Sequence, residues 1–214
     1  AVLGGILTPE KRERVYLATK VYRQRCLDGC VGRNSRNNIL TSIERSLRLL
    51  KTDYVDLYQL HHPDPETPVE ETLETLTMLV RQGKVRHVGV SNHYAWQMAA
   101  MLGESRVHGW EPIISVQADY DILDRQIERE IVPFCREFNM AIMCYGPLCG
   151  GILTGKYLRG IPEASRAAKN KRMKELLEDE TVKEICQHLS DTASQHDLTA
   201  AQAAILWLLA KPHA

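Results

Sequence analysis

One stretch decides the fold class of this chain: TDYVDLYQLHHPDPETPVEETLETLTMLVRQGKVRHVGVSN, residues Thr52–Asn92. Its runs Val55–His61 and Val85–Val90 are rich in Val and Leu and lack clean alternation of apolar and polar residues, which suits parallel strands buried on both faces. Between them, apolar side chains recur at helical spacing from Val69 to Val80, until Gly83 ends the pattern. The stretch therefore predicts a strand, a crossover helix and a second, parallel strand.

Capping signals predict where several helices begin. Thr67-Pro68-Val69-Glu70 has the pattern of a capping box, with proline at the first helical position. Thr199 and Gln202 form a second such pattern, and Ser35 is expected to open a third helix. The helices thus alternate with the strands along most of the chain.

The strand pattern recurs, and each predicted strand closes on polar side chains. The strands are Val15–Val21, Val55–His61, Val85–Val90, Ile113–Ala118 and Ala141–Tyr145. The polar residues at their ends are Lys20, His61, Ser91 with Asn92, Gln117, and Tyr145. Parallel strands wound in this way place their C-terminal ends at one face, where α/β barrels build active sites. The sequence therefore predicts an enzyme of the α/β class with a TIM-barrel architecture.

Composition excludes several classes of protein. The 214 residues are 44% hydrophobic and are expected to form a single domain, residues 1–214. Lys+Arg and Asp+Glu are equal at 27 each, so no excess charge draws the chain to nucleic acid or to an anionic membrane. No apolar run approaches the roughly 20 residues of a membrane span, so no membrane insertion is expected.

The six cysteines favour a reducing, cytoplasmic location, because they do not form a disulfide framework. Cys26 and Cys30 are four residues apart but lack a second Cys/His pair at zinc spacing. We therefore expect no metal site, with a metal or redox role for these two as a minor alternative.

The strand count bears on completeness. A closed barrel of this type has eight strands, and the sequence supplies about five. We expect an incomplete (β/α)8 barrel, a fragment lacking two strands before residue 1 and one after residue 214.

The same segments resemble a known family. Thr52–Asn92, LATK, SVQADYDIL, YGPLCGGILTGKY and GIPEASR (Gly160–Arg166) closely resemble the aldo-keto reductases, in particular the branch with potassium channel β-subunits and bacterial relatives. The resemblance implies a (β/α)8 barrel that transfers hydride from NADPH to the carbonyl of a small aldehyde or ketone.

The resemblance assigns catalytic roles to Lys20 and His61, as half of a catalytic tetrad. Lys20 would lower the pKa of a tyrosine general acid, and His61 would orient the substrate carbonyl, with His62 at the rim. The tyrosine and its aspartate partner are not matched in this chain. The structural alternatives are a lysine that extends into solvent at a strand end and a hydrogen-bonded core histidine.

The resemblance also assigns a cofactor site. Ser91, Asn92 and Gln117 would hold the nicotinamide carboxamide, although Ser91 and Asn92 could instead cap the next helix. Tyr145 would stack on the nicotinamide ring or, alternatively, be a core residue. The pyrophosphate would lie along Gly146, Pro147, Leu148, Gly150 and Lys156, and the adenosine phosphate against Ser165 and Arg166. Five further basic residues are expected on a solvated face: Arg159, Lys169, Lys171, Arg172 and Lys174.

Two other functions stay open at this level. The parent protein could be an NADPH-sensing regulatory subunit with slow turnover, or this chain could be an inactive, truncated fragment. The sequence does not identify the carbonyl substrate, and it leaves a homo-oligomer open.

Overall fold

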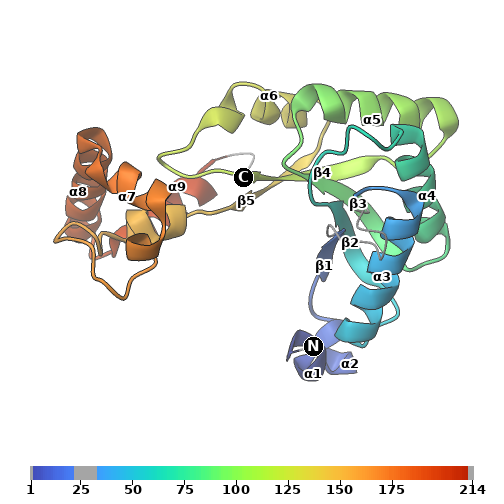
Figure 1. Cartoon of the computed structure of the whole chain (residues 1–214), viewed down its shortest axis with the longest axis horizontal. Coiled ribbons are helices and arrows are strands. Elements are labelled where there is room, and N and C mark those ends of the chain that lie inside the picture. Colours follow the sequence, from blue (N-terminus) through green and yellow to red (C-terminus); the bar gives the residue numbers. More distant parts are fainter. Residues whose placement is uncertain (1, 22–32, 212–214) are drawn as a thin grey trace. The chain divides into compact units, whose positions relative to one another are not determined.

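The computed structural model describes residues 2–21 and 33–211 of the chain (Figure 1). Five strands form one sheet in the order β1-β2-β3-β4-β5, and β1 to β4 pair in parallel. The strands are β1 (Ala18–Val21), β2 (Val55–Leu60), β3 (Val85–Ser91), β4 (Ile113–Asp119) and β5 (Ala141–Tyr145). The predicted α/β fold, with five parallel strands flanked by helices, is confirmed.

Helices occupy the connections between the strands. The first three are α1 (Val2–Ile6), α2 (Pro9–Arg12) and α3 (Arg36–Leu50), followed by α4 (Val69–Arg81), α5 (Ala95–His108) and α6 (Ile131–Glu137). The later helices are α7 (Lys171–Glu178), α8 (Glu180–Gln195) and α9 (Ala200–Leu209), with short 3-10 turns η1 (Gln126–Glu128), η2 (Cys149–Thr154) and η3 (Ala167–Lys169). None of the helices in residues 2–21 and 33–211 is long and apolar enough to cross a membrane.

The chain divides into two compact units. The first contains Ala1–Gln117 and Phe134–Ala141, and the second contains Ala118–Pro133 and Ile142–Ala214. The expectation of a single domain stays a prediction.

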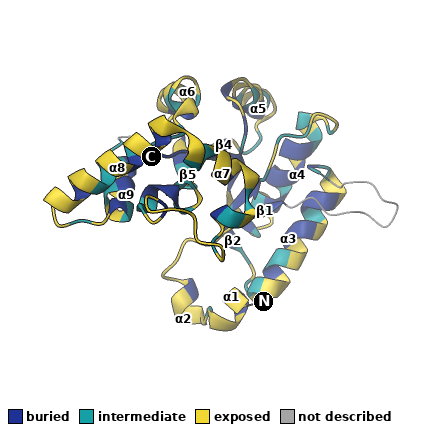
Figure 2. Ribbon diagram, turned by 60° about the vertical axis from the view of Figure 1, so that its left-hand side comes forward, coloured by how far each residue is buried: buried dark blue, intermediate teal, exposed yellow. Residues whose placement is uncertain are grey.

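In the first unit, α3 and α4 cover one face of the sheet (Figure 1). The apolar stripe of α3 is buried, with Ile39 and Ile43 fully enclosed, and so are Leu73 and Leu76 of α4 (Figure 2). On the strand side, Tyr58 is buried and its hydroxyl donates to the Ile39 carbonyl at 3.1 Å. This packing fixes which face of β2 meets the helices.

Strand β1 is shorter than predicted, because it begins at Ala18 rather than at Val15. Val15 and Tyr16 are exposed, and the Leu17 N–H donates to the carboxylate of Asp56 at 2.8 Å. A side chain thus takes the hydrogen bond that strand pairing would have used.

The predicted capping box at Thr67 is wrong. Helix α4 begins at Val69 with Pro68 as its N-cap residue, so proline lies one position earlier than predicted. The Thr67 hydroxyl instead donates to Asp64 at 2.6 Å, and Asp64 also accepts the N–H groups of Asn34 and Glu66. A buried carboxylate with several donors offers threonine a better partner than the helix end does. The other two helix starts are confirmed, at Ser35 and in the Thr199–Gln202 capping box.

The second unit contains the long connection after β5. Its start is irregular: Gly150 and Gly151 in η2 have left-handed backbone angles. Helices α7 and α8 then follow, each opened by a side-chain cap from Asn170 or Asp179. Side chains of η2, α7, α8 and α9 form a separate apolar core that includes Ile152, Leu153, Tyr157, Met173, Val182, Cys186 and Ala204.

Candidate active site

In the first unit, the strand register brings predicted site residues to one face of the sheet. Lys20 pairs with Gln59, Gln59 pairs with Gly89, and Ser91 pairs with Gln117. Paired residues project to the same face, and so do residues two apart on one strand. Lys20, Ser91 and Gln117 therefore share a face of the sheet.

That face is opposite the covering helices. Tyr58, which precedes Gln59 on β2, projects to α3 through its hydrogen bond with the Ile39 carbonyl. Because neighbouring side chains alternate between faces, Gln59 and its paired residue Lys20 lie on the other side. In an α/β barrel this is the inner face.

Lys20 is half-buried on that face. Burial lowers the pKa of its ammonium group. Within residues 2–21 and 33–211, no carboxylate forms an ion pair with it. Because desolvation disfavours the charged form of Lys20, a charged group that binds nearby would shift the pKa of this lysine further.

His61 directly follows the end of β2. Its ring stacks on that of His62, with centroids 4.5 Å apart and an angle of 14° between the planes. His61 is half-buried and His62 is exposed. The stacking places His62 beside His61 rather than pointing away from it, so the two rings form one polar pair.

Ser91 and Asn92 do not cap the next helix. The N-cap residue of α5 is Tyr94, whose N–H donates to the Gln97 side chain at 3.0 Å. The Ser91 hydroxyl donates to the Gln117 carbonyl at 3.0 Å. The alternative of N-capping for these residues is therefore wrong.

Asn92 instead forms a hydrogen bond with the backbone of His61, just after the end of β2. Its backbone is left-handed, at φ +60°, and its amide Nδ2 donates to the His61 carbonyl at 3.0 Å. The same nitrogen lies 3.2 Å from the Ser91 hydroxyl oxygen. Asn92 thus fixes the backbone that carries His61, a contact that the sequence did not predict.

In the second unit, a cavity of about 700 Å³ opens beside the glycine-rich segment. Its lining includes Tyr145, Gly146, Pro147, Leu148, Gly150, Lys156 and Arg166. All of these were expected to contact the cofactor. Ser165, expected beside Arg166, is not among the lining residues, and its hydroxyl accepts the Ala168 N–H at 3.3 Å.

Two glycines of the cavity lining lie close to the side chains of neighbouring residues. A Cβ atom at Gly146, where φ is +71°, would lie 2.6 Å from the Asp119 carboxylate. A Cβ atom at Gly151, where φ is +107°, would lie 2.9 Å from the Lys156 ammonium. The positive φ angles disfavour larger residues at both positions, and a Cβ atom there would displace the Asp119 or Lys156 side chain.

Three cations line the same cavity: Lys156, Arg166 and Arg172. Arg172 was expected on a solvated face; it is exposed, but it also contributes to this lining. Three cations around a glycine-rich turn form a surface that suits a phosphorylated ligand.

Three carboxylates belong to the same cavity lining as these cations. Asp119, Asp121 and Asp124 belong to the lining, and burial raises the pKa of Asp119 and of Asp121. Asp121 is buried and accepts the N–H groups of Leu123 and Asp124 at 2.7 and 2.8 Å. Burial, together with Asp121, also raises the pKa of the Cys149 thiol to about 12, so this thiol stays protonated.

Comparison with known proteins identifies the family of this chain. The sequence model of the Aldo/keto reductase family matches residues 1–214. The chain belongs to the aldo/keto reductase family.

Relatives named as oxidoreductases or reductases are similar to between about half and nearly all of the chain. The "Uncharacterized oxidoreductase YrpG" of Bacillus subtilis (strain 168) is 33% identical over 210 residues, covering 95% of this chain and 62% of the relative. The "Aldo-keto reductase YhdN" of the same strain is 37% identical over 146 residues, covering 68% of this chain and 42% of the relative. The "Aflatoxin B1 aldehyde reductase member 2" of Mus musculus is 40% identical over 121 residues, covering 56% and 33%. The chain thus spans less than two thirds of the length of each, and membership of the family supports an oxidoreductase function.

Aldo/keto reductases generally use nicotinamide cofactors, and each unit, taken by itself, has a feature that fits a part of such a cofactor. The Oε1 atom of Gln117 is buried and has no hydrogen-bond partner among the described residues. A carboxamide N–H would satisfy it. In the second unit, the glycine wall and the three cations suit a pyrophosphate.

Metal chemistry finds no support in the described part of the chain. Among residues 2–21 and 33–211, no group of three or more His, Cys, Asp or Glu side chains could hold a metal ion. The minor alternative at Cys26 and Cys30 lies outside the described residues.

Sequence reasoning missed Arg172 and the three aspartates as cavity residues. One signal for the aspartates was available, since Asp119, Asp121 and Asp124 follow directly on the predicted strand end at Gln117. Arg172 gave no such signal, because its position depends on how η3 and α7 turn back to the glycine-rich segment.

Proposed function

We propose that the protein containing this chain is an NADPH-dependent aldo-keto reductase that reduces the carbonyl of a small aldehyde or ketone. The observation that carries the proposal is the second-unit cavity, where the glycine-rich turn meets Lys156, Arg166 and Arg172. The mouse relative is named an aflatoxin B1 aldehyde reductase, which supports an aldehyde as the substrate class.

The second unit would hold the phosphates of the cofactor. Arg166 would contact the adenosine phosphate that distinguishes NADPH from NADH, since guanidinium groups bind phosphate in a bidentate way. Lys156 would offset the pyrophosphate charge, and Gly146 and Gly150 would let the backbone approach it closely. Tyr145, which is 38% exposed, would offer its ring face to the nicotinamide.

The first unit would bind the reacting end. Gln117 and Ser91 would hold the carboxamide, with Asn92 keeping His61 in place through the His61 carbonyl. NADPH supplies the hydride when it is bound. His61 would orient the substrate carbonyl oxygen, and Lys20 would favour the ionised form of a neighbouring phenol and so ease proton donation.

Two further proposals concern the activity of this chain by itself and its location in the cell. A polypeptide of these 214 residues alone does not reduce aldehydes, because the resemblance assigns none of its residues to the general acid or to the aspartate partner. A reducing, cytoplasmic location is supported by the free thiols of Cys135, Cys144, Cys149 and Cys186.

Steady-state reduction of a series of aldehydes by the natural full-length protein tests the proposal. Lys20→Met and His61→Gln are expected to lower kcat by about 10²–10⁴, the usual contribution of positioned acid–base groups. His62→Gln is the matched control, because His62 is the exposed member of the stacked pair. Equal losses in all three variants would contradict the assignment of His61.

A further inference from the structure

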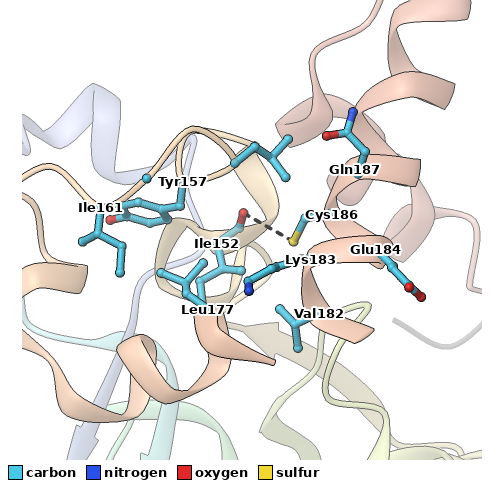
Figure 3. Close-up of a pocket in the computed structure, with 11 residues that line it drawn as sticks. Ile152, Tyr157, Ile161, Leu177, Val182, Lys183, Glu184, Cys186 and Gln187 are labelled. Carbon is cyan, nitrogen blue, oxygen red and sulfur yellow. Dashed lines mark hydrogen bonds between the residues drawn. The ribbon is translucent and has the colours of Figure 1, made fainter. Parts of the chain in front are cut away.

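The second unit contains another cavity, of about 490 Å³ (Figure 3). Its walls are mostly apolar and come from η2, from the turn after it, and from α7 and α8. They include Ile152, Tyr157, Leu158, Ile161, Leu177 and Val182. The volume lies in the usual range of small-molecule sites, which is about 300–1,000 Å³.

This second cavity shares no lining residue with the glycine-rich cavity, but the two have a common wall. Gly150, Gly151 and Thr154 of η2 line the glycine-rich cavity, whereas Ile152 of the same turn lines the second cavity. The turn therefore lies between the two cavities.

One contact links the two cavities, and a second ties α8 to the turn η2 between them. The Lys156 ammonium, which lines the glycine-rich cavity, lies 4.9 Å from the centroid of the Tyr157 ring, which lines the second cavity. The Cys186 thiol of α8 donates to the Ile152 carbonyl at 3.8 Å, as the dashed line in Figure 3 shows. A molecule that pushes on Tyr157 or Ile152 would therefore act on Lys156 and on η2.

The polar groups of the second cavity favour an anionic occupant. Figure 3 shows the Lys183 ammonium directed toward Ile152 and Leu177, and the Glu184 carboxylate directed away from them. Lys183 already pairs with Glu180 at 2.6 Å, but the Glu180 side chain is 80% exposed. Such a surface pair contributes little, so the ammonium can exchange its partner for a ligand carboxylate.

We propose that the second cavity is an effector site for an amphiphilic carboxylate, with its apolar body against Ile152, Leu177 and Val182 and its head group on Lys183. Its occupant would change the affinity of the glycine-rich cavity for NADPH through η2, a consequence that rests on the proposed function. The binding site itself does not depend on that function.

Octanoate is the probe, and octan-1-ol is its neutral counterpart of the same length. Titration of the natural full-length protein should give saturable binding of octanoate, with amide chemical-shift changes grouped in residues 152–161 and 177–187. Lys183→Gln should weaken octanoate binding about tenfold, the effect of losing one charge-assisted hydrogen bond. Lys174→Gln, which changes an exposed lysine that lines neither cavity, should leave binding unchanged.

The experiments distinguish the binding of octanoate from its effect on NADPH affinity. No saturable binding, or equal binding of octanoate by the Lys183 and Lys174 variants, would overturn the site. If octanoate binds but shifts the dissociation constant of NADPH by less than about fivefold, the lower end of typical allosteric coupling, the effector role is overturned. If NADPH itself does not bind while octanoate does, the proposed function fails and the carboxylate site stands.

Discussion

Replacing Arg12 should strongly destabilise the first unit. The Arg12 guanidinium is 2.7 Å from the Asp56 carboxylate, and the two side chains are only 9% and 8% exposed. It also donates to the carbonyls of Val15 and Tyr54 at 3.0 and 3.1 Å. Arg12→Met keeps much of the stem but leaves a buried carboxylate without its main partner, which typically costs about 3–5 kcal/mol.

The contribution of Asp56 to the stability of the first unit depends on pH. Burial alone raises the pKa of Asp56, but the Leu17 N–H and Arg12 outweigh it and lower the pKa. The stability that this carboxylate contributes is therefore present above its unfolded value of 3.8 and is lost as pH falls through the folded pKa. Arg12→Met removes part of what lowers the pKa of Asp56, so the loss of stability in this variant should become smaller in acid, where Asp56 is neutral.

Urea unfolding at neutral and acidic pH measures both effects. Arg86→Met is the matched control, because Arg86 lies 3.5 Å from Asp56 but is 57% exposed. Because the Arg86 side chain is mostly in solvent, its pairing with Asp56 is expected to contribute about 1 kcal/mol or less. Similar losses of unfolding free energy for Arg12→Met and Arg86→Met would show that burial of the Arg12–Asp56 pair adds nothing to stability.

Three further predictions concern other buried or charged groups. Burial holds the pKa of His93 at about 4 rather than its usual 6.5. The free energy of unfolding should therefore rise by about 3 kcal/mol between pH 4 and pH 6.5. Urea unfolding at several pH values measures this rise, and replacing His93 should abolish it. The Tyr157 hydroxyl is buried without a partner among the described residues; Tyr157→Phe should leave the free energy of unfolding unchanged or raise it by about 1 kcal/mol, and a clear loss would reveal a partner. Arg172→Gln should weaken NADPH binding about tenfold in a fluorescence titration, whereas Lys169→Gln, outside the cavity, should not.

The fold could be predicted because its signals are local. Buried parallel strands leave continuous apolar runs, and the run at Ala141–Tyr145 has the same bounds in the structure as in the prediction. Gly146 and Gly150 were expected at the cofactor through the family resemblance, and the structure places both in the lining of the glycine-rich cavity with left-handed backbone angles.

The misses have long-range causes. Thr67 has the sequence of a helix cap, but Asp64 competes for its hydroxyl, and the carboxylate is held there by Asn34 from 30 residues earlier. Val15 looks like strand, but the Asp56 side chain ends pairing at Leu17. Asp64 is only three residues from Thr67, but its place beside the hydroxyl depends on the distant Asn34, and Asp56 is 39 residues from Leu17. A local pattern therefore does not show that either carboxylate competes.

The proposed NADPH dependence requires Arg166 to distinguish NADPH from NADH. The measurement is equilibrium binding of NADPH and of NADH to the natural full-length protein, to Arg166→Ala and to Arg159→Ala, the last an exposed arginine that does not line the glycine-rich cavity. The account predicts that the unaltered protein and Arg159→Ala prefer NADPH, and that Arg166→Ala loses at least about tenfold in NADPH affinity with little change for NADH. Equal losses for the two cofactors, or no preference for NADPH in the unaltered protein, would contradict it.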